Sequence, residues 1–492
     1  MSALPDRPPP PPPPPPPGLL ARSLLWPLAG AAALVTMPAG AALALILVAF
    51  GLRSVWRLVM RMQERERRST ERLRAGRMIL IGHDADGRPV EVPERTLAAH
   101  GLILGATGAG KTTTMLTLLR DQIAQGRGIV AIDLKGSPAF ATELRAAAEA
   151  AGRPFQEWSP DGRTHWNPLA NGNATELKDK LLDTERFTEP HYRRAAERYL
   201  QIAITTAQEA EPDRPLTLAR VVTLMNPARL AALARRAGPQ RLAHVQEYVA
   251  GLTSDQVSAV RGLGSRLAVL TESHTGPLLE PGTADGTLDL RASLEGGEVV
   301  LFSLNSSTYG GLAAMLGTLA VADLTAASGA RLSTSPAGPC QALVAIDEFS
   351  ALRSDNVLSL LVRGREAGVG VLLATQELAD LNRAGPAVRE EILGNTALKV
   401  AHRQDVPESA RAVAELTGTV QAWERSYQHR PGLRGARGAT SVSDRLVTRT
   451  RIDADRIGSM ATGEAVVVVK APYTSSVLAR IRRSAQARAA GR

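Results

Sequence analysis

A glycine-rich turn between an apolar run and a helical pattern constrains this chain most. Residues 105–112 read Gly-Ala-Thr-Gly-Ala-Gly-Lys-Thr and fit the P-loop pattern GxxxxGK[ST]. Residues 101–104 are apolar enough for a buried strand, and residues 112–125 have the composition of a helix. Because glycines let the backbone curl at the start of a helix, successive N–H groups can face phosphate oxygens. The chain therefore predicts a phosphate site within an α/β fold.

The positions of this loop have distinct expected roles. Lys111 supplies a point charge for the β- and γ-phosphates, and the Thr112 hydroxyl can ligate Mg²⁺. The residues expected to bind ATP are Gly105, Thr107, Gly108, Ala109, Gly110, Lys111, Thr112 and Thr113.

An apolar run that ends in two acids predicts the second half of the site. Residues 343–346 precede Asp347 and Glu348. Asp347 is expected to hold Mg²⁺ directly or through water, and Glu348 can polarise the attacking water as a general base. An adjacent Asp-Glu pair in the same chain as a P-loop indicates hydrolysis that drives work.

Two further candidate site residues, Gln376 and Arg365, each have a functional and a purely structural interpretation. Residues 370–375 predict a strand that ends in Gln376. Beside the acid-bearing strand, Gln376 would lie near the γ-phosphate; otherwise it is a polar strand terminus. Arg365, in a Gly-Arg-Glu-Ala-Gly segment, is either an arginine finger for a neighbouring subunit or a solvated surface residue. Residues 133–136 (Asp-Leu-Lys-Gly) and 166–169 (Trp-Asn-Pro-Leu) also follow strands, where ligand crevices form.

Apolar runs and helical stretches alternate after about residue 78. The runs expected as strands are residues 102–104, 128–132, 299–304, 343–346, 369–374 and 465–469. Helices between such strands imply an α/β domain with a mostly parallel sheet. Residues 174–275 break this rhythm and predict an all-α insertion, with helices over 192–207, 218–236 and 242–252. The α/β domain would then comprise residues 100–173 and 276–480.

The N-terminal residues have a different composition. Residues 8–17 are ten prolines, which form a stiff spacer and no core, so residues 1–18 predict a disordered head. Residues 23–52 carry no charge, and a helix of that length would be roughly 45 Å long against a bilayer core of roughly 30 Å. Residues 19–60 therefore predict a membrane anchor, either one kinked helix or a helical hairpin that turns near residues 37–40.

A basic segment follows this anchor. Nine Arg and three Glu lie between Arg53 and Arg77, and the positive-inside rule places this side in the cytoplasm. Residues 61–99 predict a basic juxtamembrane linker and the lead-in to the α/β domain. A cleaved signal peptide is rejected, because it would export a nucleotide-binding domain to a place without ATP.

The C-terminal part is also rich in arginine. Seven Arg against one acid lie in residues 425–451, and the last thirteen residues hold five Arg and no acid. The segments 425–451 and 481–492 are expected to be flexible and to contact phosphates without sequence readout, or else to be solvated loops. The formal net charge of +10 fits a polyanionic partner, whereas 3% aromatic residues argue against many stacked bases. A single cysteine, Cys340, excludes an internal disulfide framework.

Taken in order, these motifs resemble the coupling-protein ATPases of type IV secretion and conjugation, of the TraG/TraD kind. That family belongs to the FtsK/HerA superfamily of ring-forming motors. The resemblance covers about residues 19–480. It rests on the membrane anchor, the P-loop, the segments 133–136 and 166–169, the all-α insertion, and the Asp-Glu, Gly-Arg-Glu-Ala-Gly and Ala-Thr-Gln motifs.

The resemblance implies a RecA-like motor that uses ATP and Mg²⁺, as a homohexamer at the inner membrane with DNA in a central channel. It implies an all-α domain that recognises the substrate, which is DNA with its relaxase or a secreted protein, and docking to a type IV secretion channel. It assigns phosphate and metal binding to Lys111 and Thr112, metal and water to Asp347 and Glu348, the arginine finger to Arg365 and the sensor to Gln376. The compact membrane segment and the polyproline head depart from the family pattern.

Other function classes fit the residues less well. A membrane-anchored motor that exports proteins without DNA keeps every motif and is the alternative. A GTPase switch requires an Asn-Lys-x-Asp motif and a transporter ATPase a Leu-Ser-Gly-Gly-Gln signature, and the sequence contains neither. A small-molecule kinase rarely needs a membrane anchor. An inactive scaffold is hard to reconcile with the presence of Lys111, Asp347 and Glu348 together.

Overall fold

A computed structural model of the protein describes the chain from residue 76 to residue 482. The residues left out of this range are 185–186, 188, 283–285, 335–340, 353, 385, 430–439 and 472–473. The predicted polyproline head, the membrane anchor, linker residues 61–75, Cys340 and the terminal residues 483–492 lie outside the described residues.

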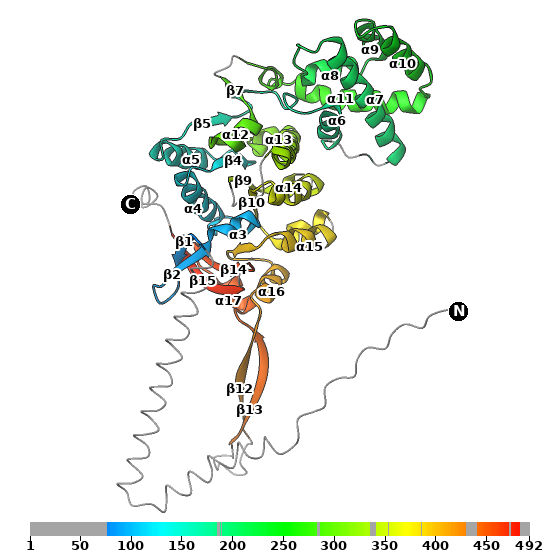
Figure 1. The fold of residues 1–492 in the computed structure, drawn as a ribbon. Coiled ribbons are helices and arrows are strands. Elements are labelled where there is room, and N and C mark those ends of the chain that lie inside the picture. Colours follow the sequence, from blue (N-terminus) through cyan, green and yellow to red (C-terminus); the bar gives the residue numbers. More distant parts are fainter. Residues whose placement is uncertain are drawn as a thin grey trace, which may run out of the picture. The chain divides into compact units, whose positions relative to one another are not determined.

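An eleven-stranded sheet forms the centre of the described chain (Figure 1). Its strand order is β2-β1-β15-β14-β11-β3-β10-β9-β4-β8-β5. The strands are β1 (Met78–His83), β2 (Pro89–Pro93), β3 (Gly101–Leu104), β4 (Gly128–Asp133), β5 (Phe155–Trp158), β8 (Val299–Ser303), β9 (Ala342–Asp347), β10 (Val369–Thr375), β11 (Leu398–Ala401), β14 (Glu464–Val469) and β15 (Ser475–Ile481). Pairing is parallel from β11 through β3 to β5 and antiparallel elsewhere.

The six apolar runs expected as strands are confirmed as β3, β4, β8, β9, β10 and β14. In their described part, the predicted linker and lead-in contain regular elements. Residues 78–93 form the hairpin β1–β2, which joins the sheet through β15, and the helix α3 (Glu94–Ala98) follows. In β2 the valines Val90 and Val92 are buried at alternate positions, a period-2 pattern that the charged residues around it obscured.

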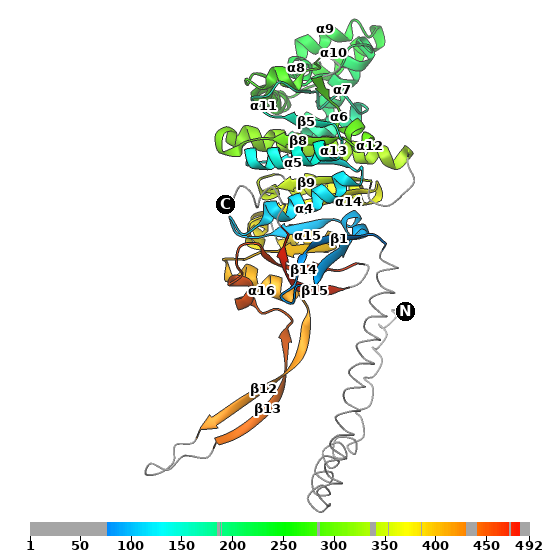
Figure 2. The same cartoon turned by 90° about the vertical axis from the view of Figure 1, so that its left-hand side faces the viewer.

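Helices cover both faces of the sheet (Figures 1 and 2). The helices around the sheet are α4 (Lys111–Ala124), α5 (Pro138–Ala150), α12 (Leu290–Gly296), α13 (Ser306–Thr334), α14 (Ser354–Glu366), α15 (Pro386–Asn395), α16 (Pro407–Leu416) and α17 (Ala454–Gly458), with 3-10 turns at Gly276–Leu279, Phe349–Ala351 and Leu378–Ala384. Ile103 and Ile129 belong to the core under α4 and α5, whereas Leu104 and Val130 belong to the core under α12, α13 and α14. This two-faced burial gives the unbroken apolar runs typical of parallel strands.

Helix α13 is the one described helix long and apolar enough to cross a membrane, over Ser306–Leu332. Of its most apolar window, 67% is buried inside the protein, and the backbone turns at Gly310. Packing against α12 and α14 therefore accounts for its apolar composition.

The described residues between 174 and 271 form helices and turns without a strand. These helices are α6 (Ala174–Leu182), α7 (Pro190–Ala210), α8 (Leu218–Leu224), α9 (Pro227–Ala234), α10 (Pro239–Ala250) and α11 (Ser254–Thr271). We call residues 174–271 the helical block. A continuous helix over 218–236 is wrong, because Asn226 caps a new helix whose first residue is Pro227. Proline suits a first turn but breaks a helix interior.

A two-stranded ribbon follows α16. Strands β12 (Thr419–His429) and β13 (Thr440–Thr450) pair antiparallel, away from the main sheet (Figures 1 and 2). The prediction of a flexible segment over 425–451 is therefore wrong for its described residues. The strands contain the β-prone residues Val, Trp and Thr, and two arginines form ion pairs across the ribbon, Arg425 with Asp444 and Arg449 with Glu424.

A buried ion pair fastens the helical block to the sheet layer. The Lys180 ammonium on α6 donates to Asp323 Oδ1 on α13 at 2.6 Å and to the carbonyls of Pro168 and Asn171. The Trp166 indole N–H donates to Asp323 Oδ2 at 3.1 Å. Trp166 lies in β6 (His165–Trp166), which pairs parallel with β7 (Thr287–Leu288) beneath the block. Burial raises the pKa of Asp323, and the Lys180 charge opposes this shift.

Removing the cation of this pair should destabilise the protein strongly. In Lys180→Met the Asp323 carboxyl stays buried without its partner, and we expect the free energy of unfolding to fall by about 3–5 kcal/mol. Chemical denaturation monitored by tryptophan fluorescence measures this change. Lys178→Met is the matched control, because Lys178 on the same helix pairs with partly exposed Glu197 and should cost about 1 kcal/mol or less. Equal losses in the two variants would contradict the assigned role.

Candidate nucleotide site

The P-loop joins the end of β3 to the start of α4 and has the backbone that phosphate binding requires. Gly108 and Gly110 have φ angles of 75° and 125°, a region that residues with a Cβ rarely adopt. Among the described residues, the N–H groups of Lys111, Thr112 and Thr113 in the first turn of α4 have no protein acceptor. These open donors form an anion cradle at a helix N-terminus.

The sheet brings the two acids to this loop. Strand β10 lies between β3 and β9, and its register sets Thr375 beside Leu104 and Ala374 beside Asp347. The carboxyl ends of these parallel strands therefore share one edge. Asp347 is buried at the end of β9, and Glu348 follows in the left-handed conformation with φ 56°.

Gln376 connects the two halves of the site. The Thr107 hydroxyl donates to Gln376 Oε1 at 3.3 Å, and Gln376 Nε2 donates to Glu348 Oε1, also at 3.3 Å. The N–H of Gly105 donates to the Gln376 carbonyl. The strand that Gln376 follows, β10, is therefore the neighbour of β9, the strand that ends in the acids. The sequence predicted a position of Gln376 near the γ-phosphate if these two strands were neighbours.

Burial perturbs the charged groups here. Desolvation raises the pKa of Asp347 to about 6, with the Lys135 charge opposing it. Desolvation also lowers the pKa of Lys111, while the charges of Glu348 and Asp347 raise it. The Lys111 ammonium donates to the Gly105 carbonyl at 2.6 Å. A cation beside Asp347 and an anion beside Lys111 would stabilise the charged forms of both groups. A phosphate with a bound metal ion supplies both charges.

Lys135 lies closer to the acids than its strand-end position alone indicated. Its ammonium pairs with Glu348 Oε1 at 2.5 Å. Burial lowers the pKa of Lys135, but the hydrogen bond to Glu348 and the charges of Asp347 and Asp133 outweigh this and raise it. Asp133 pairs in register with Asp347 on the adjacent strand. The Asp-Leu-Lys-Gly segment therefore belongs to the site.

His402 supports the P-loop from behind, and its isolated position gave no sequence signal. It is fully buried after β11; its Nδ1–H donates to the Glu464 carbonyl and its Nε2 accepts from the Thr114 hydroxyl, both at 2.8 Å. Desolvation lowers the pKa of His402 to about 4, so the ring is neutral at pH 7, and a proton on Nδ1 leaves Nε2 as the acceptor. A Cβ on Gly105 would lie 2.6 Å from the His402 Cβ, so the ring and the loop fit only with glycine there.

Two predicted positions lie elsewhere. Arg365 is exposed near the end of α14, within electrostatic reach of His100. His100 precedes the start of β3, whereas the P-loop follows the end of that strand, so the two lie at opposite ends of β3. Residues 166–169 were expected to face the crevice, and this is wrong. Trp166 is buried among Trp158 and Phe302, and its N–H belongs to the buried ion pair under the helical block.

The chain's own residues fit a magnesium nucleotide. The open N–H groups of the first turn of α4 suit phosphate oxygens, and Thr112 and Asp347 offer the hard oxygen ligands that Mg²⁺ prefers. The described residues contain no group of three or more metal-ligating side chains. A cation here would therefore complete its coordination with phosphate oxygens and water, as Mg²⁺ commonly does.

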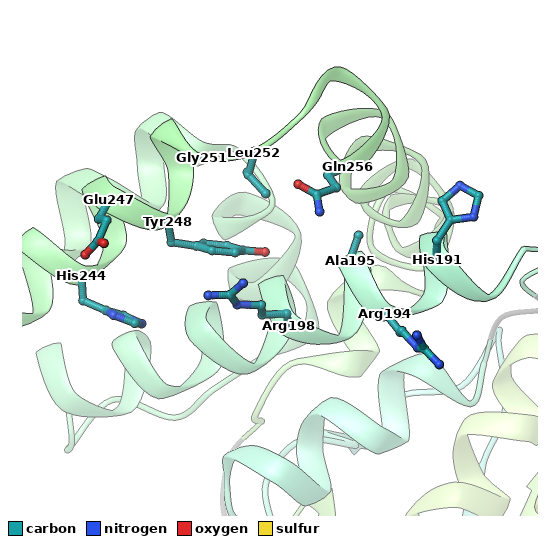
Figure 3. Close-up of a pocket in the computed structure, with 10 residues that line it drawn as sticks. All are labelled: His191, Arg194, Ala195, Arg198, His244, Glu247, Tyr248, Gly251, Leu252 and Gln256. Atoms are coloured by element: carbon teal, nitrogen blue, oxygen red, sulfur yellow. The ribbon is translucent and has the colours of Figure 1, made fainter.

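A second concave surface of about 620 Å³ lies in the helical block (Figure 3). Arg194 and Arg198 on α7 line it together with His244, Glu247 and Tyr248 on α10, so it holds two arginines and one acid, and the Arg198 guanidinium lies 4.7 Å from the Tyr248 ring centroid. Other arginines of the block pair with carboxylates, namely Arg193, Arg214, Arg220, Arg236 and Arg241. Among the described residues, Arg194 and Arg198 have no carboxylate partner. Unpaired guanidinium groups in a hollow favour an anionic ligand.

Two family models match separate parts of the chain. Residues 341–462 match the model described as the TraM recognition site of TraD and TraG. Residues 59–124, which include the P-loop, match the FtsK/SpoIIIE family. These matches confirm the resemblance to coupling-protein ATPases of the FtsK/HerA superfamily. No curated protein sequence matches the chain.

Solved structures with similar folds include the bacterial conjugative coupling protein TrwBdeltaN70 in its unbound monoclinic form. It has 16% identity, covers 83% of this chain and 90% of its own, and gives a TM-score of 0.57. The plasmid coupling protein TrwB in complex with ADP and Mg²⁺ gives a TM-score of 0.58 at 16% identity, covering 83% and 91%. VirB4 of Thermoanaerobacter pseudethanolicus gives 0.55 at 15% identity, covering 84% and 98%. At such identities the likeness establishes a shared fold, an α/β domain with a large parallel sheet.

The buried state of His402 predicts a pH dependence of stability. The folded protein holds the pKa of His402 near 4 against an ordinary value of about 6.5, so between these values only the unfolded chain binds the proton. The His402 contribution is therefore intact above pH 6.5 and is lost as the pH falls toward 4, by about 3 kcal/mol.

Chemical denaturation of the parent and of His402→Gln at pH 7 and pH 4 tests this. The parent should lose about 3 kcal/mol more than the variant over this range. The other buried groups, including His100 and Asp347, are common to both proteins and cancel in the comparison. If both proteins lose the same amount of unfolding free energy, the pKa of His402 in the folded protein is not depressed, and the prediction is wrong.

Proposed function

We propose that this chain, which resembles the TraG/TraD coupling-protein ATPases, is a membrane-anchored motor. It hydrolyses ATP with Mg²⁺ and moves DNA, or DNA with its relaxase, toward a type IV secretion channel. The observation that carries the proposal is the convergence of the P-loop, Glu348 and Gln376 at one edge of a parallel sheet, linked by hydrogen bonds through Gln376. Structural relatives crystallised with ADP and Mg²⁺ support the choice of ligand.

The chain's residues divide the work of hydrolysis. Bound ATP supplies the phosphoanhydride that is cleaved, with Mg²⁺ spreading its charge. Lys111 and the open N–H groups of α4 hold the phosphates, while Thr112 and Asp347 hold the metal. Glu348 accepts the proton of the attacking water at a carboxylate oxygen. Gln376, bonded to both Thr107 and Glu348, reports the state of the γ-phosphate to the loop.

Arg365 acts on the site of a neighbouring copy. It is exposed at the end of α14 and lies at the opposite sheet edge from its own P-loop, so it serves no phosphate within its own chain. A ring of six copies, with ATP at each interface, would present Arg365 of one copy to the phosphates of the next. An arginine finger is worth roughly 10³–10⁵ in rate where it operates.

Basic surface suits phosphate contact by the motor. Arg445 in β13 and Arg451 directly after it have no carboxylate partner among the described residues, and Trp423 of the same ribbon is exposed. Contacts of this kind are indifferent to sequence, which a motor moving along DNA needs. Residues 19–60 anchor this motor in the inner membrane, and the basic residues after them keep the ATPase domain in the cytoplasm.

A second candidate function is export of proteins without DNA. The hollow lined by Arg194 and Arg198 favours it, because bidentate guanidinium contacts suit the carboxylates of an acidic peptide. On either proposal the helical block recognises the substrate.

ATP turnover by the purified full chain with Mg²⁺, with and without DNA, tests the function. We expect hydrolysis that single- or double-stranded DNA accelerates. Lys111→Ala should abolish turnover because phosphate binding is lost. Glu348→Gln should keep ATP binding and lose at least about 100-fold in turnover, the usual contribution of a general base. Hydrolysis that no DNA accelerates would shift the assignment to protein export, and no hydrolysis at all would refute the motor.

Mixing two inactive variants tests the trans role of Arg365. Arg365→Ala and Glu348→Gln should each bind nucleotide and fail to hydrolyse it. In mixed rings, some interfaces combine an intact Glu348 from one copy with an intact Arg365 from its neighbour, so turnover should return. Arg363→Ala is the matched control, since this exposed arginine lies on the same helix and should keep its activity. Mixtures that stay inactive would place Arg365 outside the reaction.

A further inference from the structure

The turn after β4 holds Lys135 rigidly at the nucleotide site. Asp133 accepts the N–H of Lys135 at 2.9 Å and that of Ser137 at 2.6 Å. Gly136 between them has φ 67°, and a Cβ there would lie 2.8 Å from the backbone of Asn305. These contacts hold the backbone of the turn in place. Movement of the Lys135 charge therefore comes from its flexible side chain.

The ammonium of Lys135 engages one of the two oxygens of the Glu348 carboxylate, the group expected to act as the base. It lies 2.5 Å from Glu348 Oε1, and Gln376 Nε2 donates to the same oxygen at 3.3 Å. An oxygen engaged by two donors has little capacity left to accept the proton of an attacking water. In this arrangement Oε1 is occupied, and Lys135 and Gln376 hold the carboxylate in place.

The same ammonium faces the place of the phosphates. Its charge lowers the pKa of Lys111, so the two ammonium groups lie within electrostatic reach of each other. The Lys135 side chain is 41% exposed, whereas that of Glu348 is only 14% exposed. Lys135 thus has room to move where Glu348 has little. A lysine is a compact charge on a flexible stem and can change partners without moving its backbone.

We propose that Lys135 is a positioning residue with two alternating partners, Glu348 in the empty site and the γ-phosphate when a triphosphate is bound. This inference rests on the proposed function and deepens it. A γ-phosphate carries more negative charge than one carboxylate and draws the ammonium away. Glu348 Oε1 then becomes free to accept the water proton. A diphosphate lacks that group, so Lys135 stays on Glu348 and the site distinguishes the two nucleotides.

A static role makes the opposite prediction. If Lys135 only neutralises Glu348, its removal leaves the Glu348 charge uncompensated beside the phosphates, and nucleotide affinity falls through repulsion. Removal of that charge as well would then restore the affinity. If Lys135 contacts the γ-phosphate itself, the affinity stays low whether or not Glu348 is charged.

Affinities of the full chain for ADP and for the non-hydrolysable analogue ADPNP, measured calorimetrically with Mg²⁺, separate these roles. We expect Lys135→Ala to weaken ADPNP binding about tenfold or more and ADP binding less than about threefold, since a lost charged contact costs about 1.5–3 kcal/mol. The double variant Lys135→Ala/Glu348→Gln should bind ADPNP about tenfold more weakly than Glu348→Gln alone. Lys135→Arg keeps a cation and should retain the preference for ADPNP.

Recovery of ADPNP affinity in the double variant, to the level of Glu348→Gln, would overturn the proposal and leave a static role. So would equal losses for ADP and ADPNP. Retained ADP binding shows that each variant is folded. Lys178→Ala, which removes a lysine–glutamate pair in the helical block, is the matched control and should change neither affinity. A parent that binds no nucleotide would refute the proposed function itself, whereas a parent that needs Lys111 but not Lys135 would refute this inference alone.

Discussion

Parallel pairing of β3, β10, β9 and β4 is the constraint on which the rest of this structure depends. Parallel strands in register end at the same edge, so the groups that follow them meet however far apart they lie in the chain. Here that edge collects the P-loop, Gln376, Glu348 and Lys135. Both faces of the sheet are covered by helices, which keeps the edge rigid and partly dry. A charge placed there acts more strongly than it would in water.

Buried charge serves two different ends in this molecule. At the sheet edge, desolvation raises the pKa of Asp347 and lowers that of Lys111, so burial works against the charged form of each group. That frustration suits a site completed by a metal and a phosphate. Under the helical block, Lys180 and Asp323 satisfy each other fully, with Trp166 as a further donor. The second arrangement is structural, and it joins the block to α13 at a defined angle through directional bonds.

The ribbon β12–β13 stands apart from both arrangements. Its strands are exposed on both faces at most described positions, and Trp423 is 73% exposed opposite Leu446. A two-stranded ribbon alone is at best marginally stable in water. A large exposed aromatic residue with an apolar neighbour is also typical of surfaces that contact other molecules. These properties fit an element that contacts other molecules in an assembly, such as the proposed ring around DNA.

The sequence by itself determined the composition of the core and half of the site. Long apolar runs predicted the central strands, and the P-loop and the Asp-Glu pair each carry their chemistry within a few residues. The β1–β2 hairpin and the ribbon were not predicted, because charged and polar residues within their strands weaken the period-2 signal. Only the tertiary structure decided that Lys135 meets Glu348, that His402 backs the P-loop and that Trp166 serves the core. Those contacts join residues far apart in the chain, and strand order and register, which no local pattern encodes, set the distance between them.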